Sequence, residues 1–298
     1  MKVFMALCSL ASLSFSQTSL ESVVRESSQL SQLPPRPATA LGGRLFLDSI
    51  SKLGSQKREL AMVKEILSGN VPQFLRTLQP VTYRYRDSKG RNYRLTTFVM
   101  PDYLAIGSDT DFVRVPLNLL SANTIAQKLN ATLPTRKMSN SIYQQASLKL
   151  EPSPIQASPQ MTSVSCYIQH NEAIKEQLDR FSIESRRLVA GHKKDVIYSR
   201  LLETETGAIA IFGWHKLSSH RAIQPLSTVH SAYYADYSHG IRLVNRQAIL
   251  EVDQFEFQVD IHNILRQDQL SQLVSDEGGY SLNHQVAKIY SLGSQQQL

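Results

Sequence analysis

A single cysteine in the body of the chain is the feature that most limits how this sequence can fold. Of its two cysteines, Cys8 lies in an N-terminal apolar stretch and Cys166 lies mid-chain. If the N-terminal stretch is removed, no disulfide can form within the chain, so burial of apolar side chains must stabilise the fold. The segment from Val164 to Ile168 indicates a strand or buried segment, in which Cys166 acts as a small hydrophobic residue.

Residues 1–16 have the pattern of a cleavable secretory signal peptide. Lys2 supplies a positive charge, residues 3–13 are mostly apolar, and small residues occupy positions 14 and 16. This apolar stretch is shorter than the roughly 20 residues of a membrane-spanning helix, and no later stretch approaches that length. We therefore expect cleavage after Ser16 and a secreted or periplasmic protein without a transmembrane segment.

Composition divides the rest of the chain. Residues 17–40 are rich in Ser, Gln and Pro and have few apolar residues to bury, which predicts a flexible leader. Residues 41–298 are expected to form a single domain. A Pro- and Ser-rich bridge at 147–163 is the internal boundary that a two-domain alternative would use, and its length also fits a surface crossing within one domain.

The pattern of apolar residues predicts an α+β fold with short mixed or antiparallel strands and peripheral helices. No internal repeat and no regular alternation of helices and strands is found, which argues against a doubly wound sheet. A turn at Asp87 to Gly90 between two alternating segments predicts a hairpin. The main predicted elements are helices at 45–51, 56–67, 134–146, 171–182, 261–265 and 269–274, and strands at 81–86, 93–100, 103–107, 112–115, 195–198, 208–214 and 241–244.

The chain is basic, with a formal net charge of +7. Such an excess favours binding to anionic surfaces, so an anionic envelope polymer is the expected partner. The basic residues are scattered and are not interleaved with aromatic residues that could stack on bases, so no nucleic acid is expected as a partner. The sequence does not determine the oligomeric state.

Four of the eight histidines lie between positions 192 and 239 with acidic residues nearby, and this is the strongest functional signal in the chain. Histidine transfers protons near neutral pH and is the commonest metal ligand in proteins. His215 is expected at a strand end, and His192 and His239 each adjoin a glycine. The residues predicted to be catalytic are His192, Asp195, His215 and His239.

Neighbouring side chains complete the predicted site. Arg242 could clamp a carboxylate or phosphate in a bidentate manner, and Asp195 or Asp236 could orient an imidazole by accepting its second ring proton. The residues predicted to bind substrate are Arg242, Trp214, Lys193 and Tyr234. A divalent metal such as zinc is an open alternative to metal-free acid and base catalysis, because ligand spacing alone does not decide between them. Its predicted ligands are His192, His215, His230, His239 and Asp236.

Several motifs that would define an enzyme class are absent from the sequence. There is no His-Glu-x-x-His, no Gly-x-Ser-x-Gly and no phosphate-binding Gly-x-x-x-x-Gly-Lys. The reaction therefore cannot be assigned from a motif.

Three blocks of the sequence resemble, as a set, a family of secreted bacterial proteins to which no activity is assigned. The first block joins residues 102–109 with 133–138, the second is Gly-His-Lys-Lys-Asp-Val at 191–196, and the third joins Gly-Trp-His at 213–215 with Asp-Tyr-Ser-His-Gly-Ile-Arg-Leu at 236–243. The resemblance covers about residues 80–277. It implies a bacterial, exported protein with one domain and says nothing about activity.

Export, basic charge and clustered histidines together predict a secreted hydrolase. Its substrate would be a cell-envelope polymer, peptidoglycan or a related glycopeptide, bound in a cleft lined by histidines and aspartates. The alternative is a non-catalytic secreted protein that binds the cell wall or cell surface, in which the histidines are part of the scaffold. The hydrolase hypothesis requires that histidines far apart in the chain line one shared cavity in the structure.

Overall fold

The computed structural model describes residues 20–182, 186–205 and 207–282. The predicted signal peptide, residues 1–16, lies outside the described residues, as does the C-terminal end from residue 283. Within the described ranges, no helix is long and apolar enough to span a membrane.

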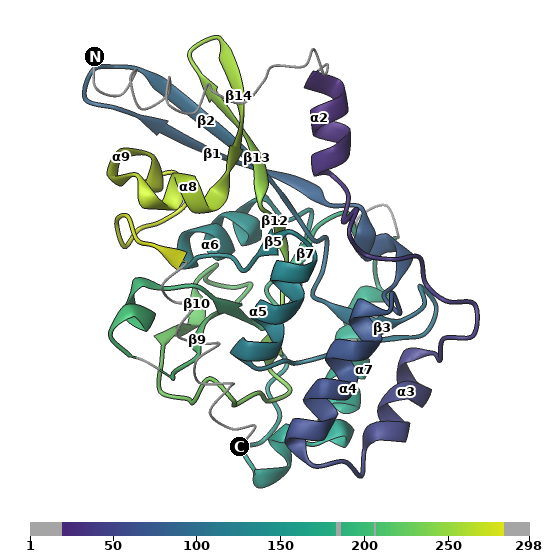
Figure 1. Cartoon of the computed structure of the whole chain (residues 1–298). Coiled ribbons are helices and arrows are strands. Elements are labelled where there is room, and N and C mark those ends of the chain that lie inside the picture. The colour runs from purple at the N-terminus through teal and green to yellow at the C-terminus, as the bar shows by residue number, and fades with distance from the viewer. Residues whose placement is uncertain (1–19, 183–185, 206, 283–298) are drawn as a thin grey trace, which may run out of the picture.

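The largest sheet is built around strand β2, which pairs antiparallel with β1, β12 and β13. The β1–β2 and β13–β14 hairpins lie side by side in this sheet and project together at one end of the molecule (Figure 1). The predicted hairpin is therefore confirmed. The six strands are β1 (Gln79–Arg86), β2 (Asn92–Val99), β5 (Ala131–Thr132), β12 (Val244–Asn245), β13 (Gln247–Val252) and β14 (Phe255–Asp260).

Local sequence explains the β1–β2 hairpin. Asp87 Oδ1 accepts hydrogen bonds from two backbone amides of the turn, and Gly90 has a φ of 82°, which favours glycine. Alternation buries Tyr83 and leaves the neighbouring Arg84 exposed. The register places Arg84 directly opposite Arg94, so two arginines share one face of the hairpin.

A second sheet joins four strands in the order β10, β9, β8, β11. β11 runs parallel to β8, with His239 opposite Lys194. The sheet therefore brings the block around residues 191–196 beside the block around 236–243. Its strands are β8 (Lys194–Ile197), β9 (Ala210–His215), β10 (Ala222–Ser227) and β11 (His239–Gly240).

Two short ladders complete the strand pairing. One is antiparallel, between β3 (Ala105–Gly107) and β4 (Phe112–Arg114), and the other is parallel, between β6 (Leu148–Lys149) and β7 (Val189–Ala190). Of the strand predicted at 241–244, only Val244 lies in a strand, as the first residue of β12, and β11 ends just before it at Gly240.

Helices pack around these sheets, and α3, α4 and α7 lie at the end of the molecule away from the two hairpins (Figure 1). The prediction of a strand or buried segment at 164–168 is corrected in one respect, because these residues begin helix α7, where the Ser163 hydroxyl accepts a hydrogen bond from the Cys166 amide. The helices are α2 (Leu20–Ser27), α3 (Gly43–Ile50), α4 (Ser55–Leu67), α5 (Leu119–Lys128), α6 (Arg136–Gln145), α7 (Val164–Leu178), α8 (Ile261–Arg266) and α9 (Asp268–Ser271), with short 3₁₀ turns η1 (Gln73–Arg76), η2 (Pro159–Thr162) and η4 (Arg200–Glu203).

One main hydrophobic core runs from Leu30 to Leu282 and contains residues from both sides of the 147–163 bridge. Within the bridge, Ile155 packs against this core and Leu150 is buried in a small satellite cluster. The 147–163 bridge is therefore packed against a single domain and does not separate two domains. The structure confirms the α+β class as a single domain.

The segment predicted as a flexible leader differs from that expectation from Leu20 onward. Residues 20–27 form helix α2, and Asn245 Nδ2 donates a hydrogen bond to the carbonyl of the buried Ser27. Leu30 and Leu33 are buried in the main core. Arg36 donates hydrogen bonds to the side chain of Asn70 and to the backbone carbonyls of Gly107, Ala40 and Leu41. The two leucines and the arginine fix a segment whose overall composition is typical of a mobile one.

Candidate functional site

One set of predicted site residues comes together around His239. The ring of Tyr234 lies 5.7 Å from the ring of His239 and stacks on the ring of His230 at 4.2 Å. The Tyr234 hydroxyl donates a hydrogen bond of 3.0 Å to Asp236 Oδ2. We refer to His230, Tyr234, Asp236 and His239 as the His239 group.

The His239 group leads from the surface into the interior. His230 is exposed, Tyr234 is half-buried, and Asp236 and His239 are buried. Lys194 lies beside them, because β8 and β11 pair there. Only the outer members of the group meet solvent, so a ligand would approach from the side of His230.

Asp236 is held as a carboxylate. Its Oδ1 accepts hydrogen bonds from the Ser238 amide at 2.8 Å and the Ser238 hydroxyl at 2.6 Å. Burial raises the pKa of Asp236, but His239, the Ser238 hydrogen bonds and Lys194 lower it by more, so the net pKa lies below the ordinary value. The interior next to His239 therefore carries a negative charge at neutral pH.

His239 is neutral at pH 7. Its side chain is 0% exposed, and burial lowers its pKa to about 4 although Asp236 opposes this shift. Among the described residues, neither ring nitrogen of His239 has a hydrogen-bond partner. A buried polar atom without a partner marks a place where a water or ligand atom is needed. A neutral imidazole in that state can accept a proton.

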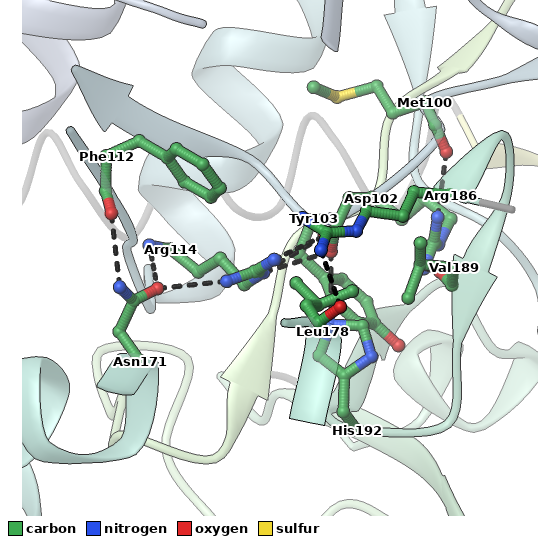
Figure 2. Close-up of polar contacts among 11 residues, drawn as sticks. Met100, Asp102, Tyr103, Phe112, Arg114, Asn171, Leu178, Arg186, Val189 and His192 are labelled. Atoms are coloured by element: carbon green, nitrogen blue, oxygen red, sulfur yellow. Dashed lines mark hydrogen bonds and ion pairs between the residues drawn. The ribbon is translucent and has the colours of Figure 1, made fainter. Parts of the chain in front are cut away.

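His192 belongs to a different cluster, which Figure 2 shows. Its Nε2 lies 3.0 Å from Asp102 Oδ1, and its ring meets the edge of Tyr103 at 4.9 Å. Burial lowers the pKa of His192 to about 4, against the raising effect of Asp102. Since a carboxylate can only accept, Nε2 carries the proton that His192 donates to Asp102.

Asp102 also forms a buried ion pair with Arg114 (Figure 2). Arg114 Nη2 lies 2.6 Å from Asp102 Oδ2, and Arg114 Nη1 donates to Asn171 Oδ1 at 3.0 Å. Asn171 in turn donates to the carbonyl of Phe112. Burial raises the pKa of Asp102, but Arg114 and His192 lower it by more, so it lies far below the ordinary range.

Asp195 does not orient His192, contrary to the prediction. Its Oδ2 accepts a hydrogen bond from the Ser139 hydroxyl, and burial raises its pKa. Asp195 lies in β8, where pairing with β9 places its carboxylate against Gly213. Asp102 takes the role that the sequence assigned to Asp195.

Arg242 and Lys193 are buried and do not present their charges to solvent, which corrects their predicted role in binding substrate. Arg242 donates to the carbonyls of Met100 and Val189, both at 2.7 Å, and lies 4.3 Å over the Tyr103 ring. Lys193 Nζ donates to the Tyr237 carbonyl at 2.5 Å, and burial lowers its pKa to about 7. Both side chains fix the backbone around the His239 and Asp102 clusters.

His215 ends β9 as predicted, but its side chain packs against helix α6 and not against the His239 group or Asp102. Its Nε2 is 2.9 Å from Asn140 Oδ1, and its ring stacks on Tyr143 at 4.1 Å. The structure describes no contact from His215 to His192 or His239. The four predicted catalytic residues therefore do not share one cavity, and His239 alone stands in the group that reaches the surface.

Trp214, predicted to bind substrate, is almost fully buried and packs between His192 and Lys194. Its indole nitrogen donates to the His192 carbonyl at 3.2 Å, and Lys194 Nζ lies 4.8 Å over its ring. Its φ of 56° and the φ of 121° at Gly213 break the alternation of β9. The regular strand geometry therefore ends before His215.

The predicted metal ligands do not fit a metal centre. In the part of the chain that the structure describes, no three His, Cys, Asp or Glu side chains are arranged to hold an ion. His192 is occupied by Asp102, and His215 by Asn140. His230, Asp236 and His239 are neighbours, but Tyr234 lies between the two imidazoles.

Sequence reasoning did not identify Asp102, Arg114 and Asn171 as site residues. Asp102 lies in a block that carried the family resemblance, and Arg114 lies in a predicted strand between two buried valines. A charged residue inside an apolar strand is a signal for a buried partner. Nothing local indicates which residue that partner is.

In comparisons with protein-family models, curated proteins and solved structures, nothing matches this chain. The resemblance to secreted bacterial proteins therefore stays a prediction.

Proposed function

We propose that this protein is a secreted hydrolase that cleaves a cell-envelope polymer of the peptidoglycan type, with His239 as its general base. The observation that carries the proposal is a neutral, buried imidazole that has no hydrogen-bond partner in the described part of the chain. It lies next to a carboxylate and is connected to the surface through Tyr234 and His230. Titratable groups with shifted pKa values in one cluster are typical of catalytic sites.

The chemistry follows from the charges. His239 accepts a proton from a water molecule while the water oxygen attacks the electrophilic carbon of the substrate. Asp236 then stabilises the imidazolium through its negative charge, since burial alone would disfavour that cation. The imidazolium finally returns its proton to the leaving group, which restores neutral His239. Lys194, next to the group, can stabilise negative charge on the substrate.

The experiment measures release of soluble fragments from purified cell walls. His239→Ala should lower the rate by at least about 100-fold, as expected for loss of a general base. His220→Ala is the matched control, because His220 is exposed and its Nδ1 contacts the Tyr143 hydroxyl outside the His239 group.

Thermal unfolding of each variant separates loss of the base from loss of the fold. A folded His239→Ala variant with the activity of the wild type would exclude His239 as the base. A wild-type protein that binds walls and releases no fragment would exclude the hydrolase.

A second candidate function is non-catalytic binding of an anionic envelope polymer, and the β1–β2 hairpin favours it. A groove of about 270 Å³ on this hairpin is lined by basic, aromatic and polar residues and one glutamate. These residues are Arg84, Tyr85, Arg86, Asn92, Tyr93, Arg94 and Glu251. Three guanidiniums against one carboxylate attract phosphate or carboxylate groups. If the protein is a hydrolase, this groove on the β1–β2 hairpin would bind the polymer substrate.

A further inference from the structure

A cavity of about 420 Å³ lies apart from the His239 group, between η1, β4, the end of α7 and β7. Its size falls within the range of about 300–1,000 Å³ that is usual for small-molecule sites. The residues that line it are Phe74, Thr77, Gln79, Pro101, Asp102, Asp109, Phe112, Arg114, Leu178, Arg186, Arg187 and Val189. None of them was predicted from the sequence to be a site residue.

Apolar side chains form most of the wall. Phe74 and Phe112 meet edge to face with their ring centroids 5.2 Å apart. Leu178, Val189 and Pro101 add aliphatic surface. Such a surface binds the apolar body of a ligand, because contact removes apolar area of both from water.

The charged residues in the wall are unequal in number, with three arginines and two aspartates. Arg114 and Asp102 form the buried ion pair and offset each other. Asp109 Oδ1 accepts a hydrogen bond from the Phe74 amide. The three arginines exceed the two aspartates by one positive charge. Arg186 Nη2 also lies 3.8 Å from Asp179 Oδ1, and Arg187 is exposed at the cavity.

The guanidinium of Arg186 is fixed by hydrogen bonds through Nη2, and its Nε remains an unpaired donor among the described residues. Its Nη2 donates to the carbonyls of Leu178, at 2.5 Å, and Phe181, at 2.9 Å; Figure 2 shows the first of these bonds. Its Nε is buried and has no hydrogen-bond partner among the described residues. A fixed guanidinium with a free buried donor is suited to an anionic oxygen.

We propose that this cavity binds a small molecule with an apolar body and a single anionic group, a carboxylate, phosphate or sulfonate. The body packs against Phe74 and Phe112, and the anionic group accepts hydrogen bonds from Arg186 and Arg187. The site is independent of the proposed hydrolase activity, because none of its residues belongs to the His239 group.

Two fluorescent probes of similar shape test the proposal in the full chain. The anion 8-anilinonaphthalene-1-sulfonate should bind saturably, and the neutral N-phenyl-1-naphthylamine, which lacks the sulfonate, should bind at least tenfold more weakly. Decanoate should displace the anion, and decanol should not at the same concentration.

Arg187→Gln should weaken binding of the anionic probe about tenfold, because it removes an exposed positive charge at the cavity. Arg180→Gln is the matched control: it makes the same change at an exposed arginine near the end of α7 that does not line the cavity. It should leave binding unchanged. Thermal unfolding of both variants checks that the probe reports a folded protein.

Three results would each overturn the proposal. They are no saturable binding to the wild type, equal affinity for the anionic and neutral probes, and equal weakening by Arg187→Gln and Arg180→Gln. Each can occur whether or not the protein releases fragments from cell walls, so the two proposals fail separately.

Discussion

His192 Nε2 lies 3.0 Å from Asp102 Oδ1, although 90 residues separate the two in the chain. The contact joins the loop before β3 to the loop before β8. Arg114 donates hydrogen bonds to both oxygens of the same carboxylate, so one aspartate connects three parts of the fold. Its replacement should therefore affect the whole domain.

Asp102→Asn should lower the free energy of unfolding by about 3–5 kcal/mol, because it leaves the buried Arg114 charge without its counterion. Urea unfolding of the purified variant measures this. Asp48→Asn is the control, since Asp48 forms an exposed ion pair with Arg44, and its loss should cost no more than about 1 kcal/mol. Similar losses in both variants would contradict the role given to Asp102.

The proposed base predicts the pH dependence of hydrolysis. His239 acts only when neutral and its pKa is about 4, so the rate should be constant near neutral pH and fall to half as the pH drops to about 4. The charged and titratable groups that act on His239 are Asp236, Lys194, His230 and Lys193.

Two substitutions should move this acid limb in opposite directions. Lys194→Gln removes a positive charge that lowers the pKa of His239, so the limb should move to higher pH. Asp236→Asn removes a negative charge that raises this pKa, so the limb should move to lower pH. Rates of fragment release between pH 3 and pH 8 measure both, and shifts in the same direction would argue against His239 as the titrating group.

Removing charge from the hairpin should weaken wall binding without destabilising the fold. Arg84 is exposed and faces Arg94 across the strands, and Arg94 is ion-paired with Glu251. Because the remaining contact between two like charges is at best neutral for stability, loss of the Arg84 charge should cost little. We expect Arg84→Gln with Arg86→Gln to leave the melting temperature unchanged or slightly higher and to weaken binding to cell walls several-fold at low salt. Lys52→Gln with Lys57→Gln, two exposed lysines in and before α4, removes the same charge elsewhere and should have little effect.

Gly240 should not tolerate a side chain. A Cβ atom added there would lie 2.5 Å from Tyr103 Cδ1 and 2.7 Å from Lys193 Cβ. Gly240→Ala should therefore destabilise the protein by roughly 1–3 kcal/mol through overpacking. Gly54→Ala, where nothing lies within 4 Å of the added atom, should cost less, and equal melting temperatures for the two variants would contradict this packing.

Local patterns account for what could be predicted of the fold. The β1–β2 hairpin follows from alternation and from a turn that ends in glycine, and α4 follows from helical spacing of apolar residues. The error at 164–168 has a physical reason, since a short apolar run fits a buried strand and a buried helix equally well. The cap at Ser163 was the signal for a helix.

In the candidate site too, contacts between residues close in sequence could be predicted, and contacts between distant residues could not. Tyr234, Asp236 and His239 lie within six residues, so the sequence alone brings them close together. The partner of His192 could not be found in this way, because tertiary packing places Asp102 there. Arg242 was misjudged because its guanidinium binds backbone carbonyls, which no sequence pattern reveals.

The packed segment from Ser28 to Ala40 limits how far the chain can be shortened from its N-terminal side. Leu30 and Leu33 fill the core, and Arg36 ties the segment to Asn70 and Gly107. Removal of residues up to Ala40 would open that core to water and strip several backbone carbonyls of their donor. Since the carbonyl of the buried Ser27 also accepts a hydrogen bond from Asn245, a shortened chain that keeps this packing must begin before Ser27.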